Sequence, residues 1–292
     1  MSRIAFVNGR YLPHRLAAVH IEDRGYQFSD GVYEVCLFLG GRFLDLEPHL
    51  ERLARSLAAL DIAMPMGRRA LVSVMHRLMR RNRLETGTLY LQVTRGVAPR
   101  DHAVPARPPR PALVMTARRF DLAALRRRQE SGIAVVTVPD ERWKRCDIKS
   151  VSLLGNVRAK QAAGAAGGAE AWMVDDRGAI TEGASSTAWI VDRDGRLVTR
   201  HLGPDILPGI TRAVILSLTG ESGIGLVERP FSADEARRAR EAFTASTTRF
   251  IMPVVRIDGH AIGDARPGPL TRALIARHWR HVAAETGCEP PP

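Results

Sequence analysis

Lysine is rare in this chain of 292 residues, and one lysine lies in a stretch that suggests chemistry. Of the 43 basic residues, all are arginines except Lys144, Lys149 and Lys160. Arginine stays protonated at working pH, whereas a lysine amine can lose its proton and become a nucleophile. Lys149 is followed by small and apolar residues instead of the acidic partners of a surface salt bridge. We therefore treat Lys149 as a candidate nucleophile, with a solvated surface lysine as the alternative.

Two groups of small and hydroxyl residues could hold a phosphate. Gly209, Ile210 and Thr211 open a predicted helix, where free backbone N–H groups and a hydroxyl can bind an anion. Ser246 and Thr247 directly follow an apolar strand, and hydroxyl groups at a strand end can do the same. Each group also has an ordinary interpretation as turn residues, because glycine, serine and threonine are common in turns.

Charged residues in two further segments add a carboxylate, an arginine and a histidine to these candidates. Glu182 directly follows a predicted strand, where a lone glutamate is usually exposed. Arg100 and His102 lie in the Pro-, Arg- and Gly-rich loop 96–109, which suits the capture of a carboxylate or is merely a charged loop. A lysine, a carboxylate, a phosphate cradle and an arginine are the parts that hold pyridoxal phosphate. Their spacing alone does not assemble them into one site.

The first half of the chain predicts paired strands followed by helices. A hairpin joins 4–7 to 11–12 through Asn8-Gly9, a strong turn signal. Strand 32–39 turns at Gly40-Gly41, and a helix then begins near residue 47. Its leucines at 50, 53, 57 and 60 follow helical spacing, and Arg52 lies off that stripe. A second helix at 68–82 and strands at 88–95 and 112–117 follow, with the loop 96–109 between those strands.

The second half mixes hairpins with helices. We expect a strand at 133–138, a helix at 154–166, and hairpins over 171–181 and 187–199. A helix at 208–218, a capping box at Ser232 and Glu235, strands at 243–246 and 252–257, and a helix at 270–285 complete the chain. A regular alternation of strand and helix would predict a doubly wound parallel sheet. This pattern instead predicts an α/β protein with mixed, α+β-like sheets, in two domains at 1–120 and 121–292.

Composition excludes several classes of protein. No apolar run approaches the roughly 20 residues that span a bilayer, and the N-terminus lacks the apolar core of a signal peptide. The three cysteines are too few and too far apart for a disulfide framework or a zinc site, so we expect no metal and a cytoplasmic location. The net charge of +12 raises nucleic-acid binding as an alternative. Scattered arginines and only 5% aromatic residues favour a solvated basic surface instead.

Six segments, in order, resemble the D-amino acid aminotransferases. They read DRGYQFSDGVYEV (23–35), VTRGVAPRDH (93–102), RCDIKSVSLLGNVRAKQ (145–161), ITEGASS (180–186), ILPGITR (206–212) and FTASTT (243–248). That family belongs to the fold-type IV pyridoxal-phosphate enzymes, with the branched-chain aminotransferases and the aminodeoxychorismate lyases. The resemblance extends to about residue 285. It implies a small N-terminal α/β domain and a larger, barrel-like α/β cofactor domain.

The resemblance also assigns roles to single residues. It implies that Lys149 bonds to the cofactor as a Schiff base and then moves the substrate proton. It implies that Glu182 pairs with the pyridine nitrogen and that Leu207 packs on the ring. The implied phosphate-binding residues are Arg52, Ile210, Thr211, Ser246 and Thr247.

The choice of substrate depends on a predicted trap for the α-carboxylate. By the resemblance, Tyr33, Arg100 and His102 form this trap, and the loop 96–109 arrives from the neighbouring subunit of a homodimer. Branched-chain aminotransferases, which act on L-substrates, lack the Arg-x-His pair, and the lyases act on a chorismate derivative. The resemblance therefore favours transamination between a D-amino acid of the D-alanine or D-glutamate type and pyruvate or 2-oxoglutarate. The two related enzyme classes and a basic nucleic-acid-binding protein remain the alternatives.

Overall fold

The structure is a computed structural model that describes residues 3–220 and 223–291 and separates the chain into two units. Unit 1 comprises Met1–Asp121, Ile148–Ser152 and Glu285–Cys288. Unit 2 comprises Leu122–Asp147, Leu153–Ala284 and Glu289–Pro292. The short segment that carries Lys149 therefore belongs to unit 1, whereas the sequence-based division had assigned it to the larger domain.

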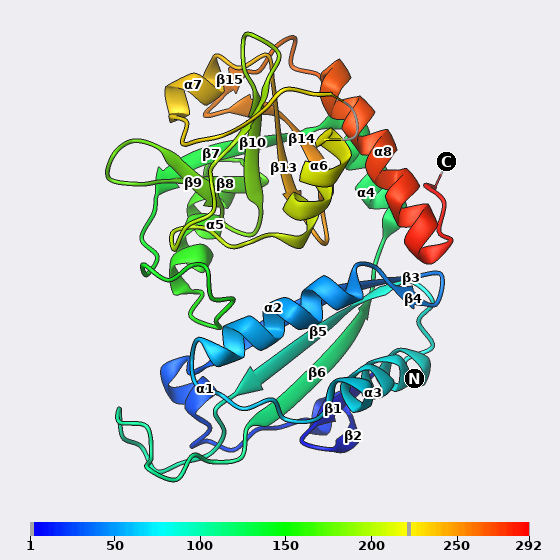
Figure 1. The fold of residues 1–292 in the computed structure, drawn as a ribbon, viewed down its shortest axis with the longest axis vertical. Helices are drawn as coiled ribbons and strands as arrows, with labels where there is room; N and C mark the ends of the chain where they lie inside the picture. The colour runs from blue at the N-terminus through cyan, green and yellow to red at the C-terminus, as the bar shows by residue number, and fades with distance from the viewer. Residues whose placement is uncertain (1–2, 221–222, 292) are drawn as a thin grey trace. The chain divides into compact units, whose positions relative to one another are not determined.

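Unit 1 is built on an antiparallel sheet with the strand order β2-β1-β6-β5-β3-β4 (Figure 1). Its strands are β1 (Ile4–Val7), β2 (Arg10–Pro13), β3 (Gly31–Leu39), β4 (Arg42–Phe43), β5 (Gly87–Thr94) and β6 (Ala112–Arg119). Its helices are α1 (Arg24–Phe28), α2 (Leu46–Ala58) and α3 (Arg68–Arg81), with a 3-10 turn at His14–Leu16.

The local signals of the sequence account for most of this unit. Asn8 and Gly9 both have positive φ angles (47° and 93°), as the tight turn between β1 and β2 requires. The expected apolar stripe of α2 is buried at Leu50, Leu53 and Leu57. It joins the buried face of α3 in one core against the sheet. Burial of these two amphipathic faces is the main force that holds the helices to the strands.

Alternation along β3 sends adjacent side chains to opposite faces of the sheet. Val32 and Cys36 belong to the core that α2 and α3 cover, and Glu34 lies between them on the same face. Tyr33 lies on the other face, where its ring stacks on that of Tyr90 at 5.7 Å between centroids. One strand therefore presents a tyrosine on one side and a buried carboxylate on the other.

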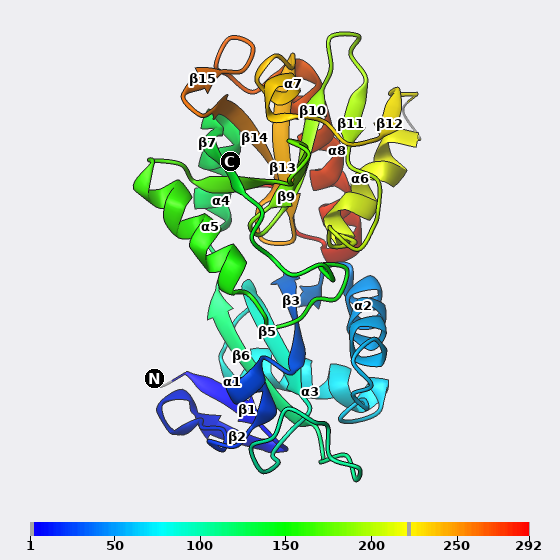
Figure 2. The same ribbon diagram turned by 90° about the vertical axis from the view of Figure 1, so that its left-hand side faces the viewer.

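Unit 2 contains a mixed sheet with the order β12-β11-β10-β13-β14-β7-β8-β9, and β15 pairs with β14 (Figure 2). Its strands are β7 (Ile133–Pro139), β8 (Glu170–Val174), β9 (Ile180–Gly183), β10 (Thr187–Val191), β11 (Leu197–Thr199), β12 (Leu226–Glu228), β13 (Glu241–Ser246), β14 (Phe250–Ile257) and β15 (His260–Ala261). Its helices are α4 (Leu122–Ser131), α5 (Leu154–Ala165), α6 (Ile210–Gly220), α7 (Ala233–Arg237) and α8 (Pro269–Thr286), whose last two residues group with unit 1.

The pairing in unit 2 confirms the expectation of mixed sheets. Strand β7 runs parallel to both β14 and β8, whereas β10, β13 and β14 form antiparallel pairs. A bridge between Gly183 and Ser186 brings β9, the last strand of the order, back beside β10, so the sheet curls. The predicted cap is also present, since Ser232 Oγ accepts a hydrogen bond from the Glu235 backbone N–H at 3.0 Å. No helix within residues 3–220 and 223–291 has the length and apolarity needed to cross a membrane.

Besides the 3-10 turn at His14–Leu16, three short elements were not expected from the sequence. They are α1, β12 and β15, each of five residues or fewer. Elements this short lack the repeated apolar spacing that a sequence pattern can show. Helix α1 instead depends on one cap, because the Asp23 side chain accepts from the Gly25 N–H at 2.9 Å and from the Thr94 hydroxyl at 2.9 Å.

Candidate functional site

Lys149 is held against β3 by its own backbone. Its carbonyl accepts a hydrogen bond from the Tyr33 N–H at 2.9 Å, and the next residue bridges to Val32. Its N–H donates to Ser56 Oγ on α2 at 3.2 Å. The side chain then reaches the tyrosine, with Nζ 3.4 Å from the Tyr33 hydroxyl and 4.4 Å from the ring centroid. The structure thus brings Lys149 and Tyr33 together, with the amine beside a hydroxyl and an aromatic face.

Cys146, three residues earlier in the chain, is the other potential nucleophile of this stretch. Burial raises the pKa of its thiol to about 12, with the Arg142 charge acting in the opposite direction. A thiol with that pKa carries almost no thiolate at neutral pH and is a poor nucleophile. Lys149 is therefore the better candidate of the two.

Arg52, expected off the apolar stripe of α2, is buried all the same, with only 3% of its surface exposed. Its Nε donates to Glu34 Oε1 at 2.7 Å and its Nη2 to Glu34 Oε2 at 2.9 Å. The His49 Nδ1 atom lies 2.8 Å from Glu34 Oε2. His49, Arg52 and Ser56 follow helical spacing and form a polar stripe beside the leucines. The role of Arg52 in binding phosphate stays a prediction.

The charge of Glu34 is maintained by this pairing. Burial alone would raise the pKa of the carboxyl. The hydrogen bonds and charge of Arg52, and then the contact with His49, outweigh burial and lower the pKa of Glu34 to about 2. The result is a fully ionised carboxylate inside the core of unit 1.

Glu182, expected to be exposed unless functional, is buried at the end of β9. Arg142 donates to its Oε1 atom, and the Leu207 backbone N–H donates to its Oε2 atom at 3.2 Å. Arg142 also binds the carboxylate of Asp140, with Nη2 2.7 Å from Oδ2. Burial would lower the pKa of Arg142, but the carboxylates of Asp140 and Glu182 raise it above its usual value. One arginine therefore binds one buried carboxylate, that of Glu182, and one partly buried carboxylate, that of Asp140.

The predicted phosphate residues of unit 2 lie near one another. Leu207, bound to Glu182, stands just before α6, whose buried first residues are Ile210 and Thr211. A Cβ atom at Gly209 would lie 3.1 Å from Thr187 Oγ1, so the start of α6 touches the start of β10. In the sheet, Thr187 pairs with Ala245, the neighbour of Ser246. The structure thus gathers the helix start and the end of β13, and Thr247 directly follows.

These residues fit the phosphate and ring of pyridoxal phosphate. The Ser246 hydroxyl is buried without a hydrogen-bond partner among the described residues, as expected of a group that binds a ligand. The first backbone N–H groups of α6 have no partners within the helix and point toward its N-terminal end. A buried carboxylate such as Glu182 can accept a hydrogen bond from a protonated ring nitrogen.

Arg100 and His102 lie in the exposed loop between β5 and β6, within unit 1. Both side chains lie against the ring of Phe28 in α1. The Arg100 guanidinium carbon is 5.0 Å from the centroid of that ring, and the centroid of the His102 ring is 5.3 Å from it. Tyr33, by contrast, lies beside Lys149. The predicted carboxylate trap therefore falls into two groups within unit 1.

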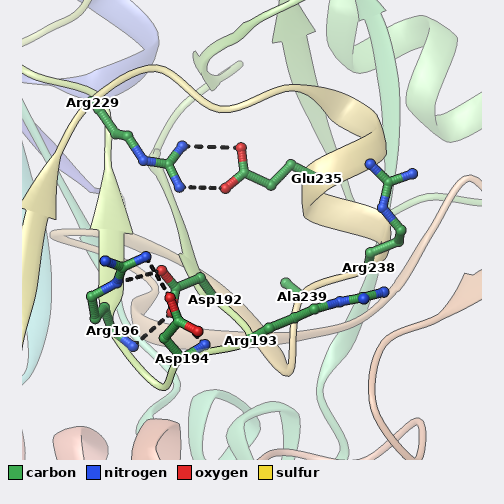
Figure 3. Close-up of a pocket in the computed structure, with 8 residues that line it drawn as sticks. All are labelled: Asp192, Arg193, Asp194, Arg196, Arg229, Glu235, Arg238 and Ala239. Atoms are coloured by element: carbon green, nitrogen blue, oxygen red, sulfur yellow. Dashed lines mark hydrogen bonds and ion pairs between the residues drawn. The ribbon is translucent and has the colours of Figure 1, made fainter.

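A separate pocket of about 330 Å³ lies in unit 2, and none of the predicted site residues lines it. Its lining residues mostly pair with one another. Figure 3 shows Arg229 facing Glu235, and Arg196 held by Asp192 and Asp194. We assign no part of the reaction to this pocket.

Three residues that hold these groups in place were not predicted from the sequence: Glu34, Arg142 and Arg24, the buried arginine of α1. Glu34 had a visible signal, since it is a lone charge inside the apolar run of β3. Arg142 and Arg24 had none, because each stands among charged or polar neighbours and looks like an exposed residue.

Comparisons with known proteins agree with this arrangement. The family model described as Amino-transferase class IV matches residues 31–257. A D-alanine aminotransferase of Bacillus licheniformis is 40% identical over 281 residues, covering 96% of this chain and 97% of that protein. A D-alanine aminotransferase of Listeria innocua is 40% identical and covers 92% of each chain.

Solved structures share the fold. The branched-chain amino acid aminotransferase of Escherichia coli superposes with a TM-score of 0.89 at 23% identity, covering 98% of this chain and 96% of that one. At that identity the likeness concerns the fold alone, and it confirms the predicted two-domain α/β architecture of mixed sheets. Pyridoxal phosphate is the cofactor that class IV membership implies, in agreement with the residues described above. The chain belongs to the amino-transferase class IV family and is an aminotransferase.

Proposed function

We propose that this enzyme moves the amino group of a D-amino acid, of the D-alanine or D-glutamate type, to a 2-oxo acid such as pyruvate or 2-oxoglutarate. The observation that carries the proposal is the Arg100 and His102 pair, present in a chain that is 40% identical to D-alanine aminotransferases over nearly its whole length. The guanidinium of an arginine can donate two parallel N–H hydrogen bonds to a carboxylate and so binds it in a fixed orientation. A fixed carboxylate determines which face of the α-carbon meets the base, and hence the handedness of the substrate.

Pyridoxal phosphate supplies the electron sink that makes the α-proton of an amino acid labile. In our proposal Lys149 holds the cofactor in the resting enzyme and then carries the proton on its Nζ atom. The Tyr33 hydroxyl, 3.4 Å away, orients that amine. Glu182 keeps a proton on the ring nitrogen, and Leu207 packs against the ring. Arg52, Ile210, Thr211, Ser246 and Thr247 bind the phosphate.

We further propose a homodimer in which the loop 96–109 of each subunit serves its neighbour. Exposed apolar side chains support this proposal, because they are numerous on the segment that leads into and includes α1 and on the loop itself. They are Leu16, Val19, Ile21, Tyr26, Val97 and Val104. A bridge between Asp23 and Val97 makes these two segments neighbours. Contiguous exposed apolar side chains mark surfaces that a partner covers, and a second copy is the partner that the loop requires.

The domain division at residue 120 and the location of the protein complete the proposal. We keep residues 1–120 as the small domain and 121–292 as the cofactor domain. We place the enzyme in the cytoplasm, where thiols stay reduced, because Cys36, Cys146 and Cys288 are all free.

The first experiment is a visible spectrum of the purified enzyme with pyridoxal phosphate, before and after adding D-alanine or L-alanine. We expect D-alanine alone to convert the absorbance of the bound cofactor to that of its amino form. Lys149→Ala should bind the cofactor without the covalent link and lose turnover by about a thousandfold or more, because it removes the base. Lys149→Arg is the matched control, since it keeps the charge but cannot act as that base.

Three outcomes would contradict the proposal. A conversion produced only by L-amino acids would reverse the assigned handedness and favour the branched-chain alternative. Turnover of Lys149→Ala near the wild-type rate would remove the central role of the lysine. Release of pyruvate from aminodeoxychorismate without an amino acceptor would favour the lyase.

A further inference from the structure

We propose that Arg24 and Phe28 of α1 position the carboxylate-binding loop, so that Arg100 and His102 meet the substrate in one orientation. The inference deepens the proposed function and rests on it for the role of those two residues. Arg24 and Phe28 touch no predicted cofactor residue; they act through the loop and are positioning residues.

The Arg24 side chain binds the backbone of the loop. Its Nη1 atom donates to the carbonyl of Asp101 at 2.6 Å and to that of Ala103 at 3.3 Å, and its Nη2 atom donates to the carbonyl of His102 at 3.2 Å. Three consecutive carbonyls of an exposed segment therefore converge on one guanidinium that is itself 3% exposed. The backbone N–H of Arg24 donates to the Gly96 carbonyl at 2.9 Å, which holds the start of the loop as well.

The other side of Arg24 is fixed to the sheet. Its Nε atom donates to Asp30 Oδ2 at 2.8 Å. The same carboxylate accepts two hydrogen bonds from Arg95, at 2.7 Å and 3.0 Å. Burial would raise the pKa of Asp30, but the two arginines lower it, so the carboxylate stays charged. Arg95 donates in turn to the carbonyls of Leu60 and Asp61.

Phe28 orients the side chains that the loop carries. The guanidinium carbons of Arg24 and Arg100 lie 4.9 Å and 5.0 Å from the centroid of its ring. The His102 ring lies 5.3 Å away. A guanidinium is attracted to the face of an aromatic ring, so Phe28 gives Arg100 a preferred direction. Backbone and side chains of the loop are thus both fixed by α1.

Close packing at Gly25 keeps α1 in place. A Cβ atom there would lie 2.2 Å from Thr94 Cγ2, at the end of β5, so only glycine allows this approach. The loop has no helix or strand of its own and is exposed. Without α1 the loop would no longer hold the Arg100 guanidinium in one orientation. A guanidinium that is poorly oriented binds a carboxylate less tightly.

The first test needs no substrate. Trypsin can cut after Arg100, whereas Arg107 and Arg110 precede prolines. We expect Arg24→Met and Arg24→Lys to speed cleavage at the bond from Arg100 to Asp101 by about tenfold, because the anchored backbone becomes free to enter the protease. Arg95 is also a buried arginine that binds Asp30, but it binds none of the loop carbonyls. Arg95→Met is therefore the matched control. Its cleavage at this bond should change by less than about twofold.

The second test separates positioning from general damage. In the half-reaction with D-alanine, Arg24→Lys and Phe28→Leu should raise the KM by about tenfold and change kcat little. With D-alaninamide, which lacks the carboxylate, both variants should match the wild type. Arg24→Lys is included because it keeps the charge beside Asp30 if the methionine variant fails to fold.

Mixed dimers then test whether the loop serves the neighbour. One subunit carries Lys149→Ala with an intact loop, and the other carries Arg24→Lys with an intact Lys149. The proposal predicts a KM near the wild-type value, because the active lysine meets the intact loop of its partner. A KM as high as in the Arg24→Lys homodimer would overturn the arrangement in trans.

The positioning role is overturned if cleavage after Arg100 is unchanged in both Arg24 variants, or if Arg95→Met accelerates it equally. It is also overturned if D-alanine and D-alaninamide suffer alike. If the wild type does not act on D-amino acids at all, the proposed function fails, and the proteolysis still reports separately on the anchor.

Discussion

Each unit of this enzyme buries an arginine against carboxylates, but the two networks carry different charges. In unit 1, Arg52 meets one carboxylate, that of Glu34, with His49 beside it. In unit 2, Arg142 meets two, those of Asp140 and Glu182. The arginine and Glu34 neutralise each other, whereas the group around Arg142 keeps a net negative charge.

The difference indicates what each network is for. A buried pair of equal and opposite charges is stable only because both members are satisfied, so Glu34 has little negative charge to offer a ligand. Arg142 with Asp140 and Glu182 carries one positive and two negative charges, and such a group favours a further cation nearby. The protonated ring nitrogen of pyridoxal phosphate is such a cation, and Glu182 is the carboxylate proposed to meet it. On this proposal, the carboxylate of Glu34 has a structural role in unit 1 and that of Glu182 a chemical role in unit 2.

The largest change should follow from Arg142→Met. It leaves the buried Glu182 and the partly buried Asp140 without this cation, so we expect the free energy of unfolding to fall by about 3–5 kcal/mol at neutral pH. Without Arg142, burial is left to raise the pKa of Asp140, and because an acid with a raised pKa is stabilised by protonation, the loss should shrink as the pH falls. Denaturant unfolding at pH 7.5 and pH 5.5 measures this. Arg142→Lys keeps the positive charge but not the several N–H donors of the guanidinium, so its free energy of unfolding should fall less than that of Arg142→Met.

An equal loss for Arg142→Met at both pH values would mean that the two carboxylates do not depend on the arginine. The comparison between the units would then lose its basis.

The next test removes the surplus charge itself. Glu182→Gln should lower turnover by about 100-fold, because the ring nitrogen loses the carboxylate that keeps its proton. Asp140→Asn is the matched control, since it removes a carboxylate from the same arginine without touching Glu182. It should cost less than about tenfold. Stopped-flow measurement of the half-reaction with D-alanine gives both values.

Equal losses in the two variants would show that total charge, rather than the position of Glu182, matters. An unchanged rate in Glu182→Gln would remove its proposed role.

These networks also show what the sequence could and could not predict. Leu50, Leu53 and Leu57 revealed α2 because a helix that covers a sheet must repeat its apolar residues at helical spacing. Polar residues on a helix follow no spacing that distinguishes buried from exposed positions. The burial of Arg52 could therefore be learned only from the structure.

Tertiary partners decide the remaining cases. Arg142 is recognisable only through Glu182, which β9 brings from 40 positions away, and Arg24 only through carbonyls 77 to 79 positions away. The site residues were predicted through resemblance to a family, because glycine, serine and threonine at helix starts and strand ends are too common to identify a phosphate site by themselves.

The smallest effect concerns the neutral pair of unit 1 and depends on pH. The pKa of Glu34 is about 2 in the folded enzyme, against an ordinary value of 4.5. A carboxyl with a lowered pKa contributes stability that is complete above pH 4.5 and is lost as the pH falls toward 2. The shift corresponds to at most about 3 kcal/mol. Glu34→Gln should therefore be less stable than the wild type at pH 7, and the difference should shrink steadily between pH 5 and pH 3.

Glu47→Gln is the control for that measurement, because it removes an exposed carboxylate from the first turn of α2, where it pairs with Arg68. An exposed pair of this kind contributes under about 1 kcal/mol, so its removal should hardly change the free energy of unfolding. If Glu34→Gln lost no more stability than Glu47→Gln at pH 7, the buried pair of unit 1 would not be structural. Glu34 would then be free to act on a ligand, and the contrast with Glu182 would disappear.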